Sequence, residues 1–166
     1  MVSCNGGCTI EADVFVEFSN LSGCWAAASI GITKTAYPED GSGYTGEYPD
    51  GAFMSISSDG DACWMTPSNL RRHAYFWLGI YAEDGTKEYL PNWSINADKY
   101  VNGWHTLRIV INSDRTVKFY ADNDLIWQPS KKIHPTVLEG RNIVLGSRSS
   151  GSAGKAYHDW VRVTTP

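Results

Sequence analysis

The stretch that decides the fold is GWHTLRIVINSDRTVKFYA, at positions 103–121. From Leu107 to Ile111 every second residue is apolar and large, which is the period of a strand that buries one face. A short polar segment at 112–115 separates this run from a second one at 116–121. Two such runs joined by a tight turn predict a β-hairpin, the basic unit of an antiparallel sheet.

The same period recurs on both sides of this hairpin, and Asp-Gly, Gly-Ser and Asn-Gly turns punctuate it. Helical periodicity is almost absent. A length of 166 residues suits one domain of ordinary size. We therefore expect a single all-β domain over 1–166, built as a two-sheet antiparallel sandwich. Besides the hairpin, strands are expected at 9–18, 24–33, 52–57, 73–82, 142–148 and 156–164.

Charge and hydropathy argue against nucleic acid as a partner and against insertion into a membrane. The formal net charge is -4, charged residues make up 19% of the chain, and Lys and Arg form no dense block. A nucleic-acid backbone requires a concentrated basic stripe, so nucleic acid is not expected as a partner. No apolar run is long enough for a transmembrane helix, and the first residues do not resemble a signal peptide. We expect a mature secreted fragment or one module of a larger protein.

The four cysteines occupy the first part of the chain and form no C-x-x-C pair. Disulfides are the favoured interpretation, with Cys4–Cys8 and Cys24–Cys63 as the preferred pairs. Four cysteines allow three connectivities, and the sequence does not choose between them. Disulfides imply an oxidising, extracellular location, whereas four free thiols would imply a reduced protein.

Several segments together resemble the concanavalin A-like lectin/glucanase superfamily, in its laminin-G-like and pentraxin-like branch. They are 9–14, 103–105, 117–126, 141–146 and 156–163. The resemblance implies a jelly roll of two curved antiparallel sheets, with one concave face that often holds glycan and frequently a structural calcium ion. Because this fold carries lectins, binding modules, hydrolases and lyases, the resemblance is more specific for fold than for function.

The strand phases turn several aromatic side chains away from the expected core. Aromatic rings stack on the C–H patches of sugar rings, and small neighbours such as Ser29, Ser55 and Gly79 would leave room for a groove. The predicted ligand-binding residues are Trp25, Tyr75, Trp77, Tyr81 and Trp160, with Arg108, His158 and Arg162 as hydrogen-bonding groups. A slip of one residue in strand phase would instead make the rings part of the core. Trp104 is assigned to the core.

Three carboxylates share one face of the first strand, namely Glu11, Asp13 and Glu17. Glucanases of the superfamily that the chain resembles carry catalytic acids at Glu-x-Asp-x-Glu or Glu-x-Asp-x-x-Glu spacing, whereas the spacing here is Glu-x-Asp-x-x-x-Glu. Retaining glycosidases hold their two carboxyl groups about 5–5.5 Å apart, which Glu11 and Asp13 approach. The simpler interpretation is a solvated strand face, with catalysis and metal ligation as the alternatives.

A calcium ion is a further expectation. The phase of the last strand places Asp159 on the inward side, and a buried carboxylate must be paired or must coordinate a cation. Asp159, Glu11 and loop carbonyls are the candidate ligands. The alternative is that Asp159 accepts backbone N–H bonds or pairs with an arginine.

The function that this reasoning favours is non-catalytic recognition of a polysaccharide or oligosaccharide on an aromatic-lined face. One alternative is a compact glycoside hydrolase or polysaccharide lyase on the same fold. A second is a protein-interaction or adhesion module that uses the same rings as a hot spot. A structural spacer without a ligand is the third.

Overall fold

The structure is a computed structural model that describes residues 3–17, 27–34, 51–58, 73–91, 94–139, 142–146 and 155–166. Its strands are β1 (Cys8–Glu17), β2 (Ala27–Thr33), β3 (Gly51–Ser58), β4 (Ala74–Tyr81), β5 (Lys87–Tyr89), β6 (Trp104–Ile111), β7 (Val117–Ala121), β8 (Asp124–Trp127), β9 (Asn142–Gly146) and β10 (Lys155–Thr164). Two single turns of 3-10 helix, η1 (Asp98–Tyr100) and η2 (Pro135–Val137), lie between them. Among the described segments no helix is long and apolar enough to cross a membrane.

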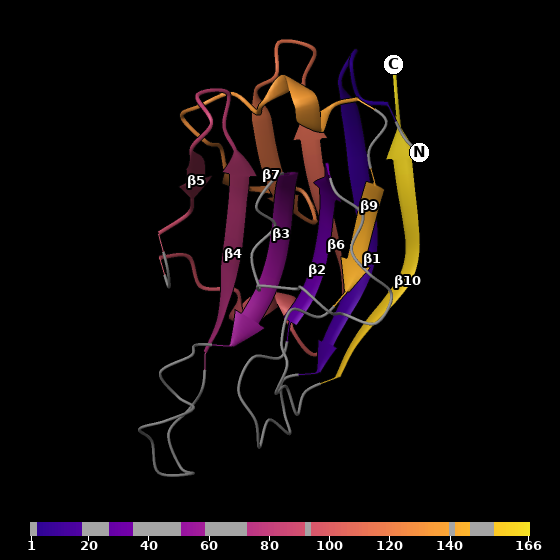
Figure 1. Cartoon of the computed structure of the whole chain (residues 1–166). Helices are drawn as coiled ribbons and strands as arrows, with labels where there is room; N and C mark the ends of the chain where they lie inside the picture. Colours follow the sequence, from indigo (N-terminus) through magenta and orange to yellow (C-terminus); the bar gives the residue numbers. More distant parts are fainter. Residues whose placement is uncertain are drawn as a thin grey trace, which may run out of the picture.

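The described strands form two layers (Figure 1), and the order within each layer sets which distant residues become neighbours. One sheet has the order β10-β1-β6-β7-β8, and the other has the order β5-β4-β3-β2-β9. All strand pairs are antiparallel. The predicted two-sheet antiparallel sandwich is confirmed.

The core lies between the layers and follows the alternation of the sequence. In β1 the residues Ile10, Ala12, Val14 and Val16 have no exposed surface, as their two-residue period predicted. The other buried contributors include Ala28, Ile30, Ile32, Met54, Ile56, Phe76, Leu78, Ile80, Leu107, Ile109, Ile111, Val117 and Phe119. The inward residues predicted for β1, β2, β3 and β4 are therefore confirmed where the structure describes them.

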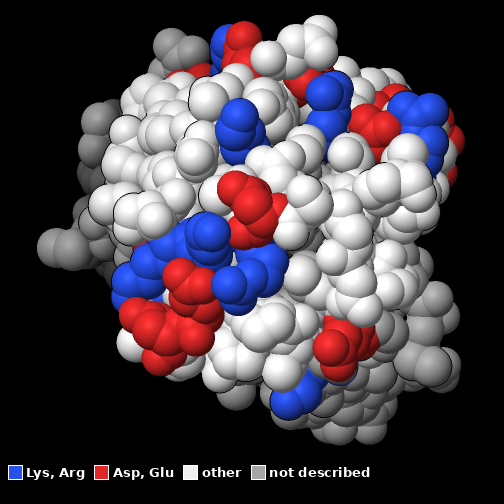
Figure 2. All heavy atoms as spheres, turned by 90° about the horizontal axis from the view of Figure 1, so that it is seen from above, with Lys and Arg blue, Asp and Glu red and all other residues white. Residues whose placement is uncertain are grey.

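Charges at one end of the sandwich are mixed in sign. Seen from above (Figure 2), acidic and basic side chains lie next to one another rather than in separate fields. Two ion pairs involve the turn that follows β4: Asp84 pairs with Lys131, which follows β8, at 2.7 Å, and Glu83 pairs with Arg115, in the turn after β6, at 3.1 Å. The described residues of this face form no uniform basic field of the kind that a polyanion backbone requires.

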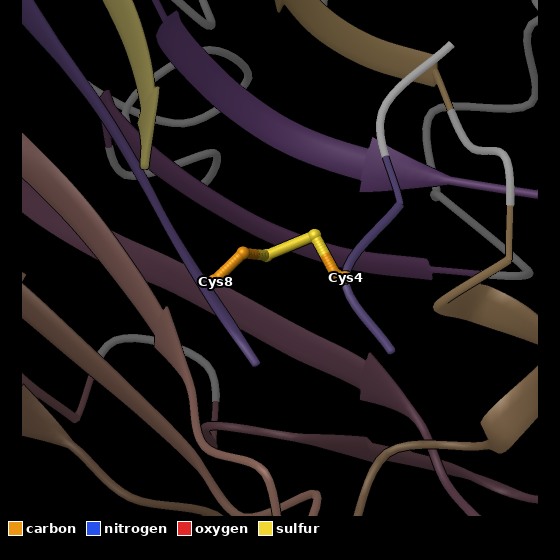
Figure 3. The surroundings of a disulfide bond; sticks show 2 residues. All are labelled: Cys4 and Cys8. Carbon is orange, nitrogen blue, oxygen red and sulfur yellow. A yellow bond between two sulfur atoms is a disulfide. The ribbon is translucent and has the colours of Figure 1, made fainter. Parts of the chain in front are cut away.

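The predicted Cys4–Cys8 disulfide is confirmed (Figure 3), whereas Cys24 and Cys63 lie outside the described residues. Both sulfur-bearing residues are buried, and the backbone N–H of Gly7 donates to the Cys4 carbonyl at 2.9 Å. Gly7 has a φ of 95°, and a Cβ there would lie 2.8 Å from the Ile111 carbonyl oxygen. Glycine is required at this position, because any side chain would strain the turn.

A β-bulge interrupts the pairing of β10 with β1. Ala12 pairs with Val161 and Val14 pairs with His158, so the single residue Asp13 faces two residues of β10. The extra residue of a bulge shifts the inward–outward alternation of the strand by one position, so side chains on one side of it point opposite to what an unbroken alternation predicts. Arg162 therefore points outward as predicted, but Tyr157 pairs with the outward Phe15, and His158 turns inward.

Candidate functional site

The outward side chains form two faces, one on each sheet. We call the β1 face the outward residues of the sheet that contains β1: Glu11, Asp13, Phe15, Trp104, Thr106, Arg108, Tyr157, Trp160 and Arg162. We call the β4 face the outward residues of the other sheet: Ser29, Phe53, Ser55, Tyr75, Trp77, Gly79 and Tyr89. Each face contains residues that the sequence had nominated.

An aromatic row crosses three strands at one end of the β1 face. Phe15 of β1 pairs directly with Trp104 of β6 on one side and Tyr157 of β10 on the other. The ring centroids are 5.7 and 6.1 Å apart, and both contacts are edge-to-face. Trp104 is 53% exposed and Tyr157 is 47% exposed. The row therefore offers a large aromatic surface to solvent.

The next row along β1 is centred on Asp13. The Thr106 hydroxyl donates to Asp13 Oδ1 at 2.5 Å, and the Trp160 indole N–H donates to Asp13 Oδ2 at 2.9 Å. This hydrogen bond involves only the N–H edge of the indole ring, and Trp160 stays 37% exposed. The bulge in β10 brings Trp160 opposite Asp13, and the hydrogen bond then fixes the orientation of the ring.

The third row places a buried carboxylate between two guanidinium groups. Arg162 Nε donates to Glu11 Oε1 at 2.7 Å, and Arg108 Nε lies 3.3 Å from Glu11 Oε2. Glu11 is only 8% exposed, so the two arginines supply the pairing that a buried charge needs. The expectation of a solvated face is wrong at Glu11. Glu11 thereby holds the 65% exposed side chain of Arg162 in place, with its guanidinium carbon 5.4 Å from the Trp160 ring centroid.

The β4 face is packed rather than open. Phe53 is 1% exposed and contacts both Trp77 and Tyr89, with ring centroids 6.0 and 6.1 Å apart. A Cβ at Gly79 would lie 2.5 Å from the Tyr89 ring and 2.8 Å from the Phe53 ring. The space above Gly79 is therefore filled by these rings.

The serines of the β4 face are buried as well. Ser29 donates its hydroxyl to Ser55 at 3.0 Å, and both side chains have no exposed surface. We expected an open groove over these small residues, and this expectation is wrong. An outward phase in a strand does not by itself make a residue accessible.

The predicted ligand-binding residues do not converge on one surface. Arg108, Trp160 and Arg162 meet on the β1 face, whereas Tyr75 and Trp77 lie half-buried on the β4 face. Tyr81 ends β4, packs against the core and stacks on His134, with ring centroids 4.8 Å apart. Trp25 lies outside the described residues.

His158 was expected to face outward, and this expectation is wrong because the bulge turns it toward the other sheet. Its ring Nε2 lies 3.1 Å from the Ser29 carbonyl oxygen of β2, which fits donation by Nε2–H in the neutral ring. Burial lowers the pKa of His158 below its ordinary value, and the bond to Ser29 offsets this only in part. His158 thus links the two layers and does not contribute to the β1 face.

Asp159 was expected to point inward, and the bulge overturns that expectation too, since Asp159 is exposed. Glu11, the other nominated calcium ligand, directs both carboxylate oxygens toward arginines. Within the described segments, no group of three or more His, Cys, Asp and Glu residues is arranged to hold a metal ion. A calcium ion stays a prediction.

Among the described residues, Trp104 and Tyr157 are exposed rings that the sequence analysis did not nominate, and the assignment of Trp104 to the core is wrong. A signal for Trp104 was present, because it shares its phase with the outward residues Thr106 and Arg108. Tyr157 had no such signal, since its direction depends on the bulge.

No protein-family model and no curated protein sequence matches the chain. The solved structure of the alginate lyase AlyC3 aligns with a TM-score of 0.57 at 10% identity, covering 98% of this chain and 66% of that chain. AlyC3 in complex with dimannuronate gives a TM-score of 0.53 at 10% identity, covering 98% of this chain and 65% of that chain. Sheep galectin-11 in complex with glycerol gives a TM-score of 0.45 at 9% identity, covering 98% of this chain and 93% of that chain.

These similarities concern the fold alone, and the shared two-sheet antiparallel sandwich is the architecture that the sequence resemblance implied. The chain spans just under two thirds of the length of AlyC3. At 10% identity, the alignment identifies no functional residue.

Proposed function

We propose that this chain binds carbohydrate on the β1 face and does not cleave it. One observation carries the proposal: the exposed rings of Trp104, Tyr157 and Trp160 lie beside hydrogen-bonding groups that are already fixed in place. Exposed apolar patches that are rimmed by polar residues mark interaction sites on proteins. Sugar rings present C–H patches that match flat aromatic surfaces.

The polar groups of the β1 face supply the second element of sugar recognition. The Glu11–Arg162 pair and the Asp13–Trp160 pair hold planar groups in single orientations before any ligand arrives. Hydroxyl groups that bond to such groups immobilise few additional rotamers, which lowers the entropic cost of binding. The exposed Arg162 side chain can also pair with a sugar carboxylate.

Alginate is the first polymer to test, because AlyC3, which shares the fold, is an alginate lyase solved with dimannuronate. The balanced charges of the β1 face are also compatible with neutral glycans. We expect dissociation constants on the order of micromolar to millimolar, since sugar hydroxyls exchange bonds to water for bonds to protein with little net gain.

The hydrogen bonds and ion pairs of Asp13 and Glu11 favour binding over cleavage. Both oxygens of Asp13 accept hydrogen bonds, and both oxygens of Glu11 face guanidinium groups. A glycosidase acid or nucleophile must approach the scissile bond closely, and these groups are engaged elsewhere. We expect no new reducing ends and no unsaturated uronates when the protein is incubated with alginate or β-glucans. Turnover that disappears in Glu11→Gln would favour the hydrolase or lyase alternative.

The decisive binding experiment compares tryptophans on the two faces. A glycan array identifies ligands, and calorimetry then measures affinities for Trp160→Ala, Trp104→Ala and the matched control Trp77→Ala. We expect the first two to weaken binding by about tenfold or more, which corresponds to roughly 1.4 kcal/mol, and Trp77→Ala to retain it. Loss of binding in Trp77→Ala alone would move the site to the β4 face. A protein partner lost with Trp104→Ala and insensitive to sugar would favour the adhesion alternative.

We further propose an extracellular location and a role as a module of a larger protein. The Cys4–Cys8 disulfide supports the location, since disulfides persist in oxidising compartments. The calcium proposal is tested separately: a rise in melting temperature on adding Ca²⁺ that Asp159→Asn removes would support it, and no change would refute it.

A further inference from the structure

A hollow of about 330 Å³ lies beyond the charged row of the β1 face. Its walls come from three segments: the Gly6–Gly7 turn before β1, the turn after β6 with Ser113, and the C-terminal segment 164–166. These segments meet where the two ends of the chain lie close together (Figure 1).

The hollow is continuous with the β1 face. Thr9 pairs with Val110 on β6 and with Thr164 on β10, and all three residues line the hollow. They form the row that follows Glu11 along β1. Thr9 and Phe15 are six positions apart, so the hollow and the aromatic row lie about 20 Å apart along the strand. The β1 face is therefore a strip with exposed rings at one end and a hollow at the other.

The chemistry of the hollow suits an uncharged, hydroxyl-rich group. None of the described side chains that line it carries a charge, and the lining includes the hydroxyl-bearing residues Thr9, Ser113, Thr164 and Thr165. Hydroxyls both donate and accept hydrogen bonds, as sugar hydroxyls do. A carboxylate or a strongly apolar group would find no matching side chain there, so a sugar unit in the hollow would have to present its hydroxyls.

One wall of the hollow is preformed. The Cys4–Cys8 disulfide and the Gly7 N–H bond to the Cys4 carbonyl fix the turn that carries Gly6. A hollow with a rigid wall needs little reorganisation to accept a ligand.

We infer that the hollow is a subsite for one end of an extended glycan whose other units stack on the aromatic row. The inference rests on the proposed function and deepens it: the ligand is a chain of several sugar units, and the unit in the hollow is uncharged or presents its hydroxyls. A disaccharide is too short to contact both ends of the strip at once.

The test fills the hollow without disturbing the rest of the strip. A Cβ at Gly6 would meet only the Pro166 ring carbon at 3.8 Å, an ordinary contact, so Gly6→Gln is accommodated and projects into the hollow. The matched control is Gly146→Gln on β9 of the other sheet, where a Cβ would meet nothing within 4 Å. Thr165→Phe fills the hollow from the opposite wall, in case the turn tolerates no change.

Calorimetry measures binding of cello-oligosaccharides and mannuronate oligosaccharides, from disaccharide to hexasaccharide. In the wild-type chain we expect affinity to increase with length. Gly6→Gln and Thr165→Phe should lower hexasaccharide affinity by about tenfold and leave disaccharide affinity unchanged. Gly146→Gln should match the wild type at every length.

Two results separate the inference from the proposed function. Disaccharide binding that Trp160→Ala abolishes, without any gain from length or any effect of the filling variants, would overturn the subsite and leave the proposed function standing. Absence of binding at every length in the wild-type chain would overturn both for these polymers.

Discussion

The β1 and β4 faces are built alike in sequence and differ in what they leave exposed. Both combine outward aromatic residues with small or polar ones, on central strands and on the neighbouring edge strands β10 and β5. On the β4 face the rings pack on one another over Gly79, and Phe53 has almost no exposed surface. On the β1 face Trp104, Tyr157 and Trp160 remain exposed beside groups fixed by hydrogen bonds. Outward aromatic residues therefore indicate a binding surface only when cross-strand neighbours leave their rings uncovered.

The largest effect should come from the buried charge of the β1 face. Glu11→Gln preserves shape but leaves Arg108 and Arg162 without their counterion, and Arg108 Nε already lacks a hydrogen bond of good geometry. We expect the free energy of unfolding to fall by about 2 kcal/mol, measured by urea denaturation. The matched control is Glu139→Gln at an exposed position, which should change stability by less than about 0.5 kcal/mol. Equal effects would mean that the Glu11 row contributes no more than a surface charge.

The next effect tests the packing of the β4 face. Gly79→Ala places a methyl group within 2.5 Å of the Tyr89 ring and should destabilise the fold by about 1.5 kcal/mol. Gly146→Ala, also in a strand but with open space around its Cβ, should be neutral or slightly stabilising. The difference in thermal midpoint between the two variants measures the packing. Should Gly79→Ala behave like Gly146→Ala, the β4 face would be open after all.

A smaller effect distinguishes an exposed ring from a core ring. Trp104→Ala should cost about 1 kcal/mol, because Trp104 is 53% exposed and loses mainly its contact with Phe15. A tryptophan in a core would cost about 3–5 kcal/mol. Chemical denaturation of the variant decides between the two, and a loss in the higher range would restore the original core assignment.

The smallest effect concerns His158, whose contact with the Ser29 carbonyl links the two sheets. The folded state holds His158 with its pKa lowered from 6.5, so the fold favours the neutral ring. Stability from this group is complete above pH 6.5 and is lost as pH falls through 6.5 toward the lower pKa of the folded state. The pH dependence of unfolding between pH 7 and pH 5 should therefore be flatter in His158→Gln than in the wild-type chain. Parallel curves would assign this dependence to other groups.

The fold was predictable because alternation is a local property. In β1 and β6 the inward residues from Ile10 to Val16 and from Leu107 to Ile111 follow directly from the two-residue period. The jelly roll itself came from resemblance, since local patterns do not determine the order in which strands pair.

The site was only partly predictable because it depends on pairing between distant strands. The sequence placed Glu11, Arg108 and Arg162 outward, but their meeting in one row follows from β1 lying between β6 and β10. The bulge opposite Asp13 inserts one residue and reverses the phase of Tyr157 and His158, and no simple alternation predicts that position. The burial of Ser29 and Ser55 likewise depends on packing beyond their own strands.

The bulge also has a consequence for how copies of the protein behave toward one another. β10 is the outermost described strand of its sheet, and a long, regular border strand invites another chain to add on by backbone hydrogen bonding. The bulge near Asp159 interrupts the regular spacing of the backbone amides along this edge. The exposed carboxylate of Asp159 also disfavours pairing with an incoming β-strand. We therefore expect the distortion that orients Trp160 also to hinder the addition of a further β-strand at this edge.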